Sequence, residues 1–342
     1  MRVQLVCGGA GYIGSHLVRE LNKTEAHEVV ILDNMSTGHK QAIPHDVPVE
    51  FGDIRDSAFL DSVLSKHKPD AVMHFCASIV VPESCKDPLG YYDNNVTGTL
   101  NLIQAMNRHN VKKIIFSSTA ALFGLPEKIP IEEDDPTTPI NPYGDTKLAV
   151  ETILKWCVPR SSFQFTSRCD QAYGIKSVCL RYFNACGADD SGVIGEAHDP
   201  ETHLIPLVLQ VPLGKREKVF IFGDDYDTPD GTCIRDYVHV TDLASAHIKA
   251  LEYLGKENTS NKFNLGSGKG FSVKEIIEAA RRVTGHAIPC EVRERRAGDP
   301  AVLVASSEKV ERVLGWKRRY TSIESIVESA WKFHQGPGFT QK

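Results

Sequence analysis

The stretch Val3-Gln4-Leu5-Val6-Cys7-Gly8-Gly9-Ala10-Gly11-Tyr12-Ile13-Gly14 runs from an apolar segment into a glycine-rich turn. Residues 3–7 predict a buried strand, and the spacing of apolar residues over 15–21 predicts a helix directly after the turn. In that context, glycines three positions apart allow bare backbone to approach a pyrophosphate at the positive end of the helix. The stretch therefore predicts a strand-turn-helix unit that binds a dinucleotide.

An acidic residue stands where such a unit would meet a ribose. The apolar run 29–32 ends in Asp33, and Asn34 follows it. A carboxylate at this strand end can accept hydrogen bonds from both ribose hydroxyls and would repel a 2′-phosphate. The sequence therefore favours NAD over NADP. Glycine turns alone are often plain tight turns, so this prediction depends on the strand, the helix and the acid together.

The alternation of strands and helices continues through the first half of the chain. Apolar runs at 49–54, 71–77, 113–119 and 177–182 alternate with helical patterns near 56–67, near 92–108 and from 142. Continuous apolar strands separated by helices indicate a parallel sheet that is covered on both faces. We therefore expect an α/β fold with a doubly wound parallel sheet of the Rossmann type. Ligands of such sheets gather at the carboxyl ends of the strands.

The pattern changes after residue 182, where the loops become longer. We expect an NAD-binding domain over residues 1–183 and a smaller α/β substrate domain over 184–342, with some segments of the second returning to the first. Residues 223–231 predict a turn, a hairpin or a lid. Ser272 and Glu275 form a capping-box pattern that predicts a helix ending at Gly285.

A candidate catalytic pair lies in the helix that Pro142 opens. Tyr143 and Lys147 are one helical turn apart, so the ammonium would sit beside the phenol. A free phenol has a pKa of about 10, and ionising it at pH 7 requires about 4 kcal/mol. An ammonium together with a bound cationic ring could supply this, whereas one surface lysine could not. Thr119, at the end of the 113–119 run, could hydrogen-bond the phenol or a substrate hydroxyl.

Composition and charge exclude several classes of protein. The chain of 342 residues is 41% hydrophobic and 24% charged, as ordinary globular proteins are, and its net charge of −5 argues against a nucleic-acid surface. No apolar run reaches the roughly 18 residues of a membrane span, and we expect no signal peptide. The nine cysteines form no Cys-x-x-Cys pair, so we expect neither a disulfide framework nor a metal site, and a cytoplasmic location.

Several motifs together resemble the extended branch of the short-chain dehydrogenase/reductase family, and within it the UDP-sugar epimerases. The resemblance covers nearly the whole chain and includes Gly8 to His16, Asp33-Asn34, Gly52-Asp53-Ile54-Arg55, Tyr143 to Lys147, Leu180-Arg181-Tyr182-Phe183-Asn184 and Arg235-Asp236-Tyr237. It implies that NAD is lined by Gly8, Gly11, Tyr12, Ile13, Gly14, Asp33, Asn34, Asp53, Ile54, Phe75, Cys76, Ala77, Asn94, Tyr143, Lys147 and Phe183. It implies that the UDP-sugar contacts Thr119, Asn184, Leu204, Phe222, Arg235, Arg296, Asp299 and Leu303.

The same resemblance implies a reaction. Tyr143 would take the proton of the sugar 4-hydroxyl while C4 gives a hydride to NAD⁺, with Lys147 and Thr119 beside it. The 4-keto sugar would turn over and take the hydride back on its other face, which interconverts UDP-galactose and UDP-glucose. Related dehydratases follow the Thr119 position with an Asp-Glu pair, whereas this chain has Ala120-Ala121, and elimination would lack its acid and base.

Three departures from the family pattern leave alternatives open. Val80 stands where some epimerases have a lysine, and Leu303 stands at a pocket-wall position that is tyrosine in enzymes restricted to glucose and galactose. A smaller wall residue would admit UDP-N-acetylhexosamines or UDP-pentoses. Residues 157–167 lengthen a connection near the helices through which family members dimerise, and we expect a homodimer. A further alternative is an NAD-binding regulator without catalytic activity.

Overall fold

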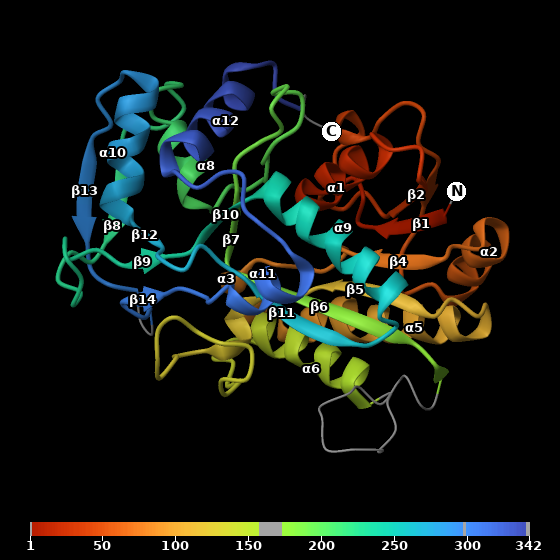
Figure 1. Cartoon of the computed structure of the whole chain (residues 1–342). Helices are drawn as coiled ribbons and strands as arrows, with labels where there is room; N and C mark the ends of the chain where they lie inside the picture. The colour runs from red at the N-terminus through yellow and green to blue at the C-terminus, as the bar shows by residue number, and fades with distance from the viewer. Residues whose placement is uncertain (1, 157–172, 297–298, 340–342) are drawn as a thin grey trace.

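A computed structural model describes residues 2–156, 173–296 and 299–339 of the chain (Figure 1). Its centre is a seven-stranded sheet in the order β11-β6-β5-β4-β1-β2-β3, and every pair in it is parallel. The strands are β1 (Arg2–Cys7), β2 (His27–Asp33), β3 (Val49–Phe51), β4 (Ala71–His74), β5 (Lys113–Ser117), β6 (Lys176–Tyr182) and β11 (Asn261–Leu265). The predicted α/β fold with a doubly wound parallel sheet is confirmed.

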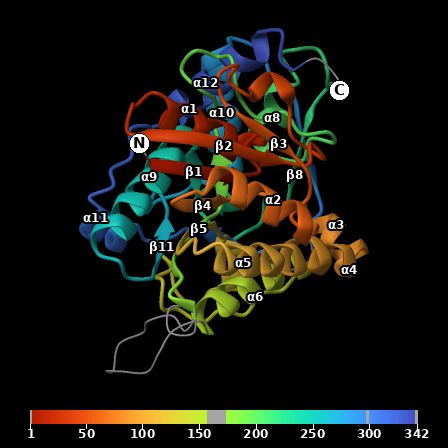
Figure 2. The same cartoon turned by 90° about the vertical axis from the view of Figure 1, so that its right-hand side faces the viewer.

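Helices cover both faces of this sheet because successive strand residues alternate between two cores. Val6, Ile31 and Met73 face a core shared with α1 (Tyr12–Asn22), α9 (Val240–Lys256) and α11 (Glu308–Leu314). Their neighbours Leu5 and Val72 face a second core. That core is completed by α2 (Ser57–His67), α5 (Gly98–Arg108) and α6 (Pro142–Trp156), and α5 and α6 lie side by side in Figure 2.

A smaller group of elements packs at one end of the sheet, around α8 (Leu204–Leu209), α10 (Val273–Thr284) and α12 (Ile323–Gln335) (Figure 1). Three small sheets accompany these helices, with strand orders β10-β7, β12-β9-β14 and β13-β8. Their strands are β7 (Asn184–Cys186), β8 (Val219–Phe222), β9 (Ile234–Arg235), β10 (Tyr237–His239), β12 (Phe271–Ser272), β13 (Cys290–Arg293) and β14 (Val302–Leu303). Three segments that follow residue 184, namely α9, β11 and α11, belong to the large sheet and its cover.

Local signals in the sequence account for several element boundaries. The α6 helix begins at Pro142, and the side chain of Asn141 accepts a hydrogen bond from the backbone N–H of Gly144 at 2.9 Å, which caps the first turn. Both hydrogen bonds of the predicted capping box form between Ser272 and Glu275, and α10 ends before Gly285 as predicted.

Two expectations about local structure need correction. The hairpin alternative for residues 223–231 is wrong, because β8 before it pairs with β13 and β9 after it pairs with β12 and β14. The helical pattern near 92–108 is not one regular helix. It consists of α4 (Pro88–Tyr92), a π-helical turn (Asp93–Thr97) and α5, and this turn sets the direction of two asparagine side chains in the site.

The remaining short elements are α3 (Val81–Lys86) and the 3₁₀ turns Lys40–Ala42 and Ala120–Phe123. Among the described residues, every helix is too short or too polar to cross a membrane.

Candidate active site

Most of the predicted site residues lie at the carboxyl edge of the large sheet. Asp33 ends β2 and Asn34 follows it, Phe75 follows β4, Thr119 lies two residues beyond β5, and Phe183 follows β6. The turn Gly8–Gly11 joins β1 to α1, which begins at Tyr12, three residues before the predicted helix, and so includes Gly14. Residues 53–54 follow β3. Because parallel strands end at one edge, segments far apart in the sequence meet there.

The glycine turn is compact and its helix end is uncapped. Gly8 has a φ of +83°, which favours glycine, and a Cβ on Gly14 would lie 2.1 Å from the carbonyl oxygen of Gly8. The N-cap residue of α1 is Gly11, and no side chain caps the first turn. Backbone N–H groups at such a helix start attract an anion such as a pyrophosphate.

Asp33 holds this turn in place. It is 6% exposed, and its two oxygens accept hydrogen bonds from the backbone N–H groups of Ala10 at 2.9 Å and Met35 at 2.8 Å. A carboxylate has about four acceptor positions, so two remain for the ribose hydroxyls that the sequence predicted. Asp33 therefore both shapes the glycine turn and has the capacity to bind the ligand.

Next to it, Asn34 and Asp53 are linked across two strand ends. The amide of Asn34 donates to Asp53 at 2.9 Å, and the guanidinium of Arg55 donates to the same carboxylate at 2.8 and 2.9 Å. These hydrogen bonds, with that of Arg55 the strongest, hold the pKa of Asp53 well below its usual range. By contrast, the Ile54 side chain is buried in the core.

The segment after β4 is held by asparagines of the π-helical turn. Asn94 donates to the carbonyl of Cys76 at 3.4 Å and to the hydroxyl of Ser78 at 3.3 Å. Asn95, which the sequence analysis did not single out, is buried and bonds both the N–H and the carbonyl of Ser78, as well as the hydroxyl of Thr146. It thereby joins this strand end to α6.

Lys147 projects from α6 into the interior behind the strand ends. It is 2% exposed, and its ammonium donates to the carbonyl of Ser117 at 2.8 Å and lies 4.9 Å from the ring centre of Phe116. Burial lowers its pKa to about 8, although the electrostatic effects of Cys76 and Glu151 act to raise it. Lys147 is therefore a buried cation at the base of the site and not a solvated surface charge.

Tyr143 lies one turn earlier on the same helix and faces Thr119. Burial raises the pKa of the phenol, and a hydrogen bond with the Thr119 hydroxyl lowers it. Since burial is the larger effect, the protein by itself keeps this phenol protonated. A cationic ring beside the phenol is then needed to make it a base near neutral pH.

A buried ion pair lies behind this pair of residues. Glu151, one turn beyond Lys147, accepts two hydrogen bonds from the guanidinium of Arg181 at 2.9 and 2.5 Å and one from the hydroxyl of Ser118 at 2.5 Å. Arg181 is 3% and Glu151 9% exposed. The pair fixes α6 against β6. The sequence signal that could have revealed it is the single charged residue, Arg181, in the apolar run 177–182.

The predicted substrate residues gather around β9 and β14. Arg235 donates to the carboxylate of Asp299 at 2.5 Å and is paired in register with Leu303. The guanidinium of Arg296 lies 4.2 Å from the ring centre of Phe222. These contacts involve five of the predicted substrate residues, namely Phe222, Arg235, Arg296, Asp299 and Leu303.

Other predicted residues connect this group to the catalytic pair. Leu303 and Phe183 pack on one small core around Ala120, the residue after Thr119. Asn184 donates to the backbone carbonyl of Asp236, next to Arg235, at 2.9 Å. Leu204 lies farther along the chain as the first residue of α8, where it packs against a different core.

Arg293 and Arg295, which form a basic cluster with Arg296, have other contacts. Arg295 pairs with Asp225 at 2.5 Å and lies over Tyr226, and Arg293 pairs with Glu291 at 2.6 Å. Of this cluster, Arg296 is therefore the better candidate for a diphosphate contact.

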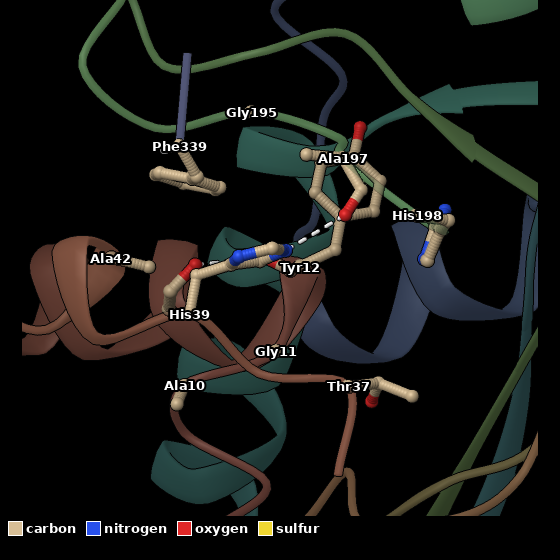
Figure 3. A pocket seen from close by; sticks show the side chains of 11 residues that line it. Ala10, Gly11, Tyr12, Thr37, His39, Ala42, Gly195, Ala197, His198 and Phe339 are labelled. Atoms are coloured by element: carbon tan, nitrogen blue, oxygen red, sulfur yellow. Dashed lines mark hydrogen bonds between the residues drawn. The ribbon is translucent and has the colours of Figure 1, made fainter. Parts of the chain in front are cut away.

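A pocket lies against the start of α1 (Figure 3). Its wall includes Gly11 and Tyr12 on one side and residues 195, 197 and 198 on the other. His39 crosses its floor to the carbonyl of Ala197 at 2.8 Å and stacks on Phe339 at 4.5 Å between ring centres. Tyr143, Lys147 and Thr119 do not line it, so it is separate from the catalytic pair.

Comparisons with known proteins agree with this architecture. The sequence model of the NAD dependent epimerase/dehydratase family matches residues 4–266. A UDP-glucose 4-epimerase of Halalkalibacterium halodurans is 56% identical over 331 residues, which cover 97% of this chain and 95% of that protein.

Two solved structures are similar over almost the full length. UDP-glucose 4-epimerase from Bifidobacterium longum, in complex with NAD⁺ and UDP, has a TM-score of 0.88 and 38% identity, with coverage of 97% and 98%. The UDP-Glc/GlcNAc 4-epimerase from Campylobacter jejuni has a TM-score of 0.84 and 43% identity, with coverage of 98% and 99%. The chain therefore belongs to the NAD dependent epimerase/dehydratase family.

Proposed function

We propose that the protein binds NAD and interconverts UDP-galactose and UDP-glucose by inverting C4 of the sugar. The observation that carries this proposal is the group formed by Tyr143, Lys147 and Thr119 at the carboxyl edge of the sheet, the edge at which α1 also begins without a side-chain cap. The names of the similar proteins support the same substrate class.

Different residues of this chain would bind different parts of the cofactor. The uncapped N–H groups at the start of α1 would hold the pyrophosphate, and Asp33 would hold the ribose. Asn94 and the segment 75–77 would line the nicotinamide side. When bound, NAD supplies a hydride acceptor that returns the same hydride, so no net oxidation occurs.

The catalytic residues then move one proton. Tyr143 accepts the proton of the 4-hydroxyl and later returns it, and the Thr119 hydroxyl orients the phenol. Lys147 contributes positive charge from a position fixed by Ser117. Ala120 and Ala121 supply no acid or base, so the site favours epimerisation over elimination.

The arginines would hold the nucleotide end of the substrate. Arg235 is only 13% exposed and uses part of its donor set on Asp299, which leaves donors for a diphosphate. Leu303, in register with Arg235 and packed near Ala120, would form part of the sugar wall.

The direct test uses the purified protein without any added reductant. UDP-galactose is supplied and UDP-glucose is measured, and we expect conversion to the equilibrium mixture. If no UDP-sugar is converted although NAD is retained, the protein is a regulator that binds NAD and the proposal is wrong.

Leu303 supports a second candidate, a breadth of substrate that includes UDP-N-acetylhexosamines or UDP-pentoses. A leucine leaves more room than a tyrosine, and the name of the similar C. jejuni protein includes both UDP-Glc and UDP-GlcNAc. Leu303→Tyr should lower activity on UDP-N-acetylglucosamine relative to UDP-glucose by about 10-fold or more. An unchanged ratio would remove Leu303 from the sugar wall.

We also propose a cytoplasmic homodimer that pairs through α5 and α6. The seven cysteines in the described ranges are all free thiols, which fits a reducing compartment. Leu100 on α5 is 38% exposed, and Leu89, on the neighbouring α4, is 81% exposed. Light scattering should give twice the chain mass of 37.8 kDa, and Leu100→Glu should shift the mass toward that of one chain. A single-chain mass for the unaltered protein would contradict the proposal.

A further inference from the structure

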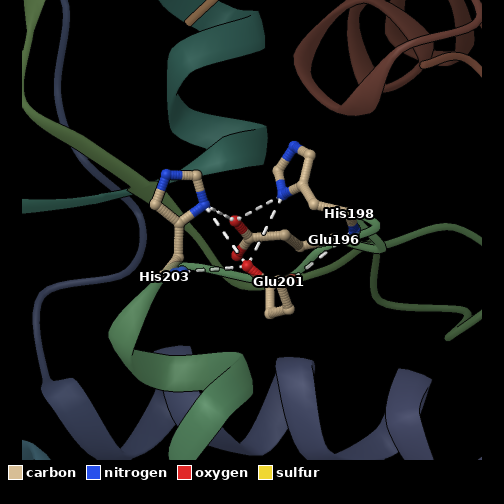
Figure 4. Close-up of side chains that lie close together, drawn as sticks. All are labelled: Glu196, His198, Glu201 and His203. Atoms are coloured by element: carbon tan, nitrogen blue, oxygen red, sulfur yellow. Dashed lines mark hydrogen bonds and ion pairs between the residues drawn. The ribbon is translucent and has the colours of Figure 1, made fainter. Parts of the chain in front are cut away.

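Four potential metal ligands meet in the segment that leads from β7 to α8. Glu196, His198, Glu201 and His203 follow one another with the spacing Glu-x-His-x-x-Glu-x-His. One ligand atom from each lies within 4.8 Å of all the others. Figure 4 shows the two carboxylates and the two imidazole Nδ1 atoms directed at one point.

The distances between these atoms are close to those of a tetrahedral site. Oε1 of Glu196 lies 3.3 Å from Nδ1 of His198, and Oε1 of Glu201 lies 3.7 Å from the Nδ1 atoms of both His198 and His203. Ligands about 2.1 Å from a tetrahedral zinc ion are separated by about 3.4 Å. The remaining contact, 2.5 Å from Glu196 to His203, is a hydrogen bond that would lengthen by about 1 Å when a metal replaces its proton.

Burial and hydrogen bonding also point to a missing partner. The side chains of Glu196 and Glu201 are 3% and 7% exposed, so two carboxylates lie close together away from water. Nδ1 of His198 is buried and makes no hydrogen bond to any described residue, although it lies 3.3 and 3.7 Å from the two carboxylates. A buried polar atom without a hydrogen bond is unfavourable, and a shared cation would satisfy all four groups.

We propose that Glu196, His198, Glu201 and His203 bind one divalent transition-metal ion, with Zn²⁺ as the preferred ion. Imidazole nitrogen favours zinc over calcium or magnesium, and two carboxylates balance its charge. Four protein ligands close the coordination sphere, which is typical of a structural and not a catalytic site. The expectation that no metal binds rested on cysteine spacing, and none of these four ligands is a cysteine.

The position of the cluster indicates what such an ion would stabilise. The ring of His198 lies edge-on to that of Tyr12 at 6.2 Å, and Tyr12 at the start of α1 donates to the carbonyl of Gly187 at 2.6 Å. His203 is the residue immediately before Leu204, where α8 begins. A metal would therefore join the segment leading into α8 to the helix end that we assign to the dinucleotide.

The test uses the full chain without a histidine tag, treated with a chelator, dialysed and then supplied with ZnSO₄. We expect one zinc per chain by mass spectrometry, a micromolar or tighter dissociation constant in competition with an indicator dye, and a melting temperature several degrees higher. Co²⁺ in place of zinc should give the intense visible bands of a tetrahedral site. These readouts do not depend on epimerase activity.

Ligand variants decide whether this cluster is the site. His198→Gln and Glu201→Gln should each weaken zinc binding by about 100-fold or more, since even changes to groups around metal ligands weaken binding 10- to 100-fold. His286→Gln at an exposed histidine and Cys85→Ser at an exposed cysteine should leave it unchanged. A zinc content below one tenth per chain would overturn the proposal, as would equal binding by His198→Gln, and either result would leave the four side chains as an ion-pair network.

Discussion

Replacing Lys147 with methionine should greatly lower activity but change the stability at pH 7 only slightly. In the folded protein the pKa of this lysine falls from 10.5 to about 8 because the ammonium is buried. A group with a lowered pKa in the folded state adds stability above its unfolded pKa and loses it as the pH falls toward the folded pKa. Lys147 therefore makes the protein more stable at high pH and less stable at neutral pH.

The magnitude follows from the two pKa values. Between pH 7 and pH 9.5 the free energy of unfolding of the unaltered protein should rise by about 2 kcal/mol relative to Lys147→Met, which cannot titrate. At pH 7 the variant loses the hydrogen bond to Ser117, which leaves a buried carbonyl without its donor at a cost of about 1–3 kcal/mol. The variant also avoids the free-energy cost of burying the ammonium. Because this cost is similar to that of the lost hydrogen bond, the net change in stability at pH 7 should be small.

Activity should respond very differently. Loss of the ammonium removes the buried positive charge one helical turn from Tyr143, and kcat for UDP-galactose should fall by about 10²- to 10⁴-fold. Urea unfolding at pH 7, 8.5 and 9.5 measures the first effect, after NAD is removed from both proteins because a bound ligand adds its own stabilisation. Lys249→Met, at a half-exposed lysine, is the matched control. A constant stability difference across these pH values, or full activity in Lys147→Met, would refute the reasoning.

Three further predictions concern the ion pair, the ribose site and the arginines. Glu151→Gln should lower the free energy of unfolding by about 3 kcal/mol, because it leaves Arg181 buried without its counter-charge. In the same urea titration, the control Glu324→Gln, which removes one charge of an exposed pair with Arg282, should change this free energy by less than about 1 kcal/mol. Asp33→Ser should weaken NAD binding by about 10-fold or more and reduce the ratio of NAD affinity to NADP affinity. Calorimetric titration with each dinucleotide measures both affinities. Arg235→Lys should raise KM for UDP-galactose by about 10-fold with a smaller change in kcat, since lysine cannot make the bidentate contact, and equal KM values would show that Arg235 does not hold the diphosphate.

The parallel sheet and the glycine turn could be predicted because they depend on local patterns. Apolar runs, helical spacing and capping residues are recognised within about ten positions of sequence. The elements β1, α6 and α10 begin within one residue of where these signals predict, whereas α1 begins three residues earlier than predicted. The family assignment, made from several such motifs together, is confirmed by the match over residues 4–266. The roles given to individual site residues stay predictions.

The contacts that hold the site could not be predicted in the same way. Asn95 reaches Ser78 and Thr146, and Arg181 reaches Glu151, across 17 to 51 positions of sequence. Such pairs depend on how the strands are ordered in the sheet, and no short pattern records that order. The Glu196–His203 segment is an exception, because the spacing of its four ligands is local and visible in the sequence.

The central claim is that the Tyr143 phenol takes the proton of the sugar while hydride leaves C4. The most direct test is the turnover of UDP-galactose by Tyr143→Phe, measured together with the NAD bound to each chain. The account predicts a loss of about 10²-fold or more in kcat with the NAD content unchanged. Turnover equal to that of the unaltered protein would contradict it.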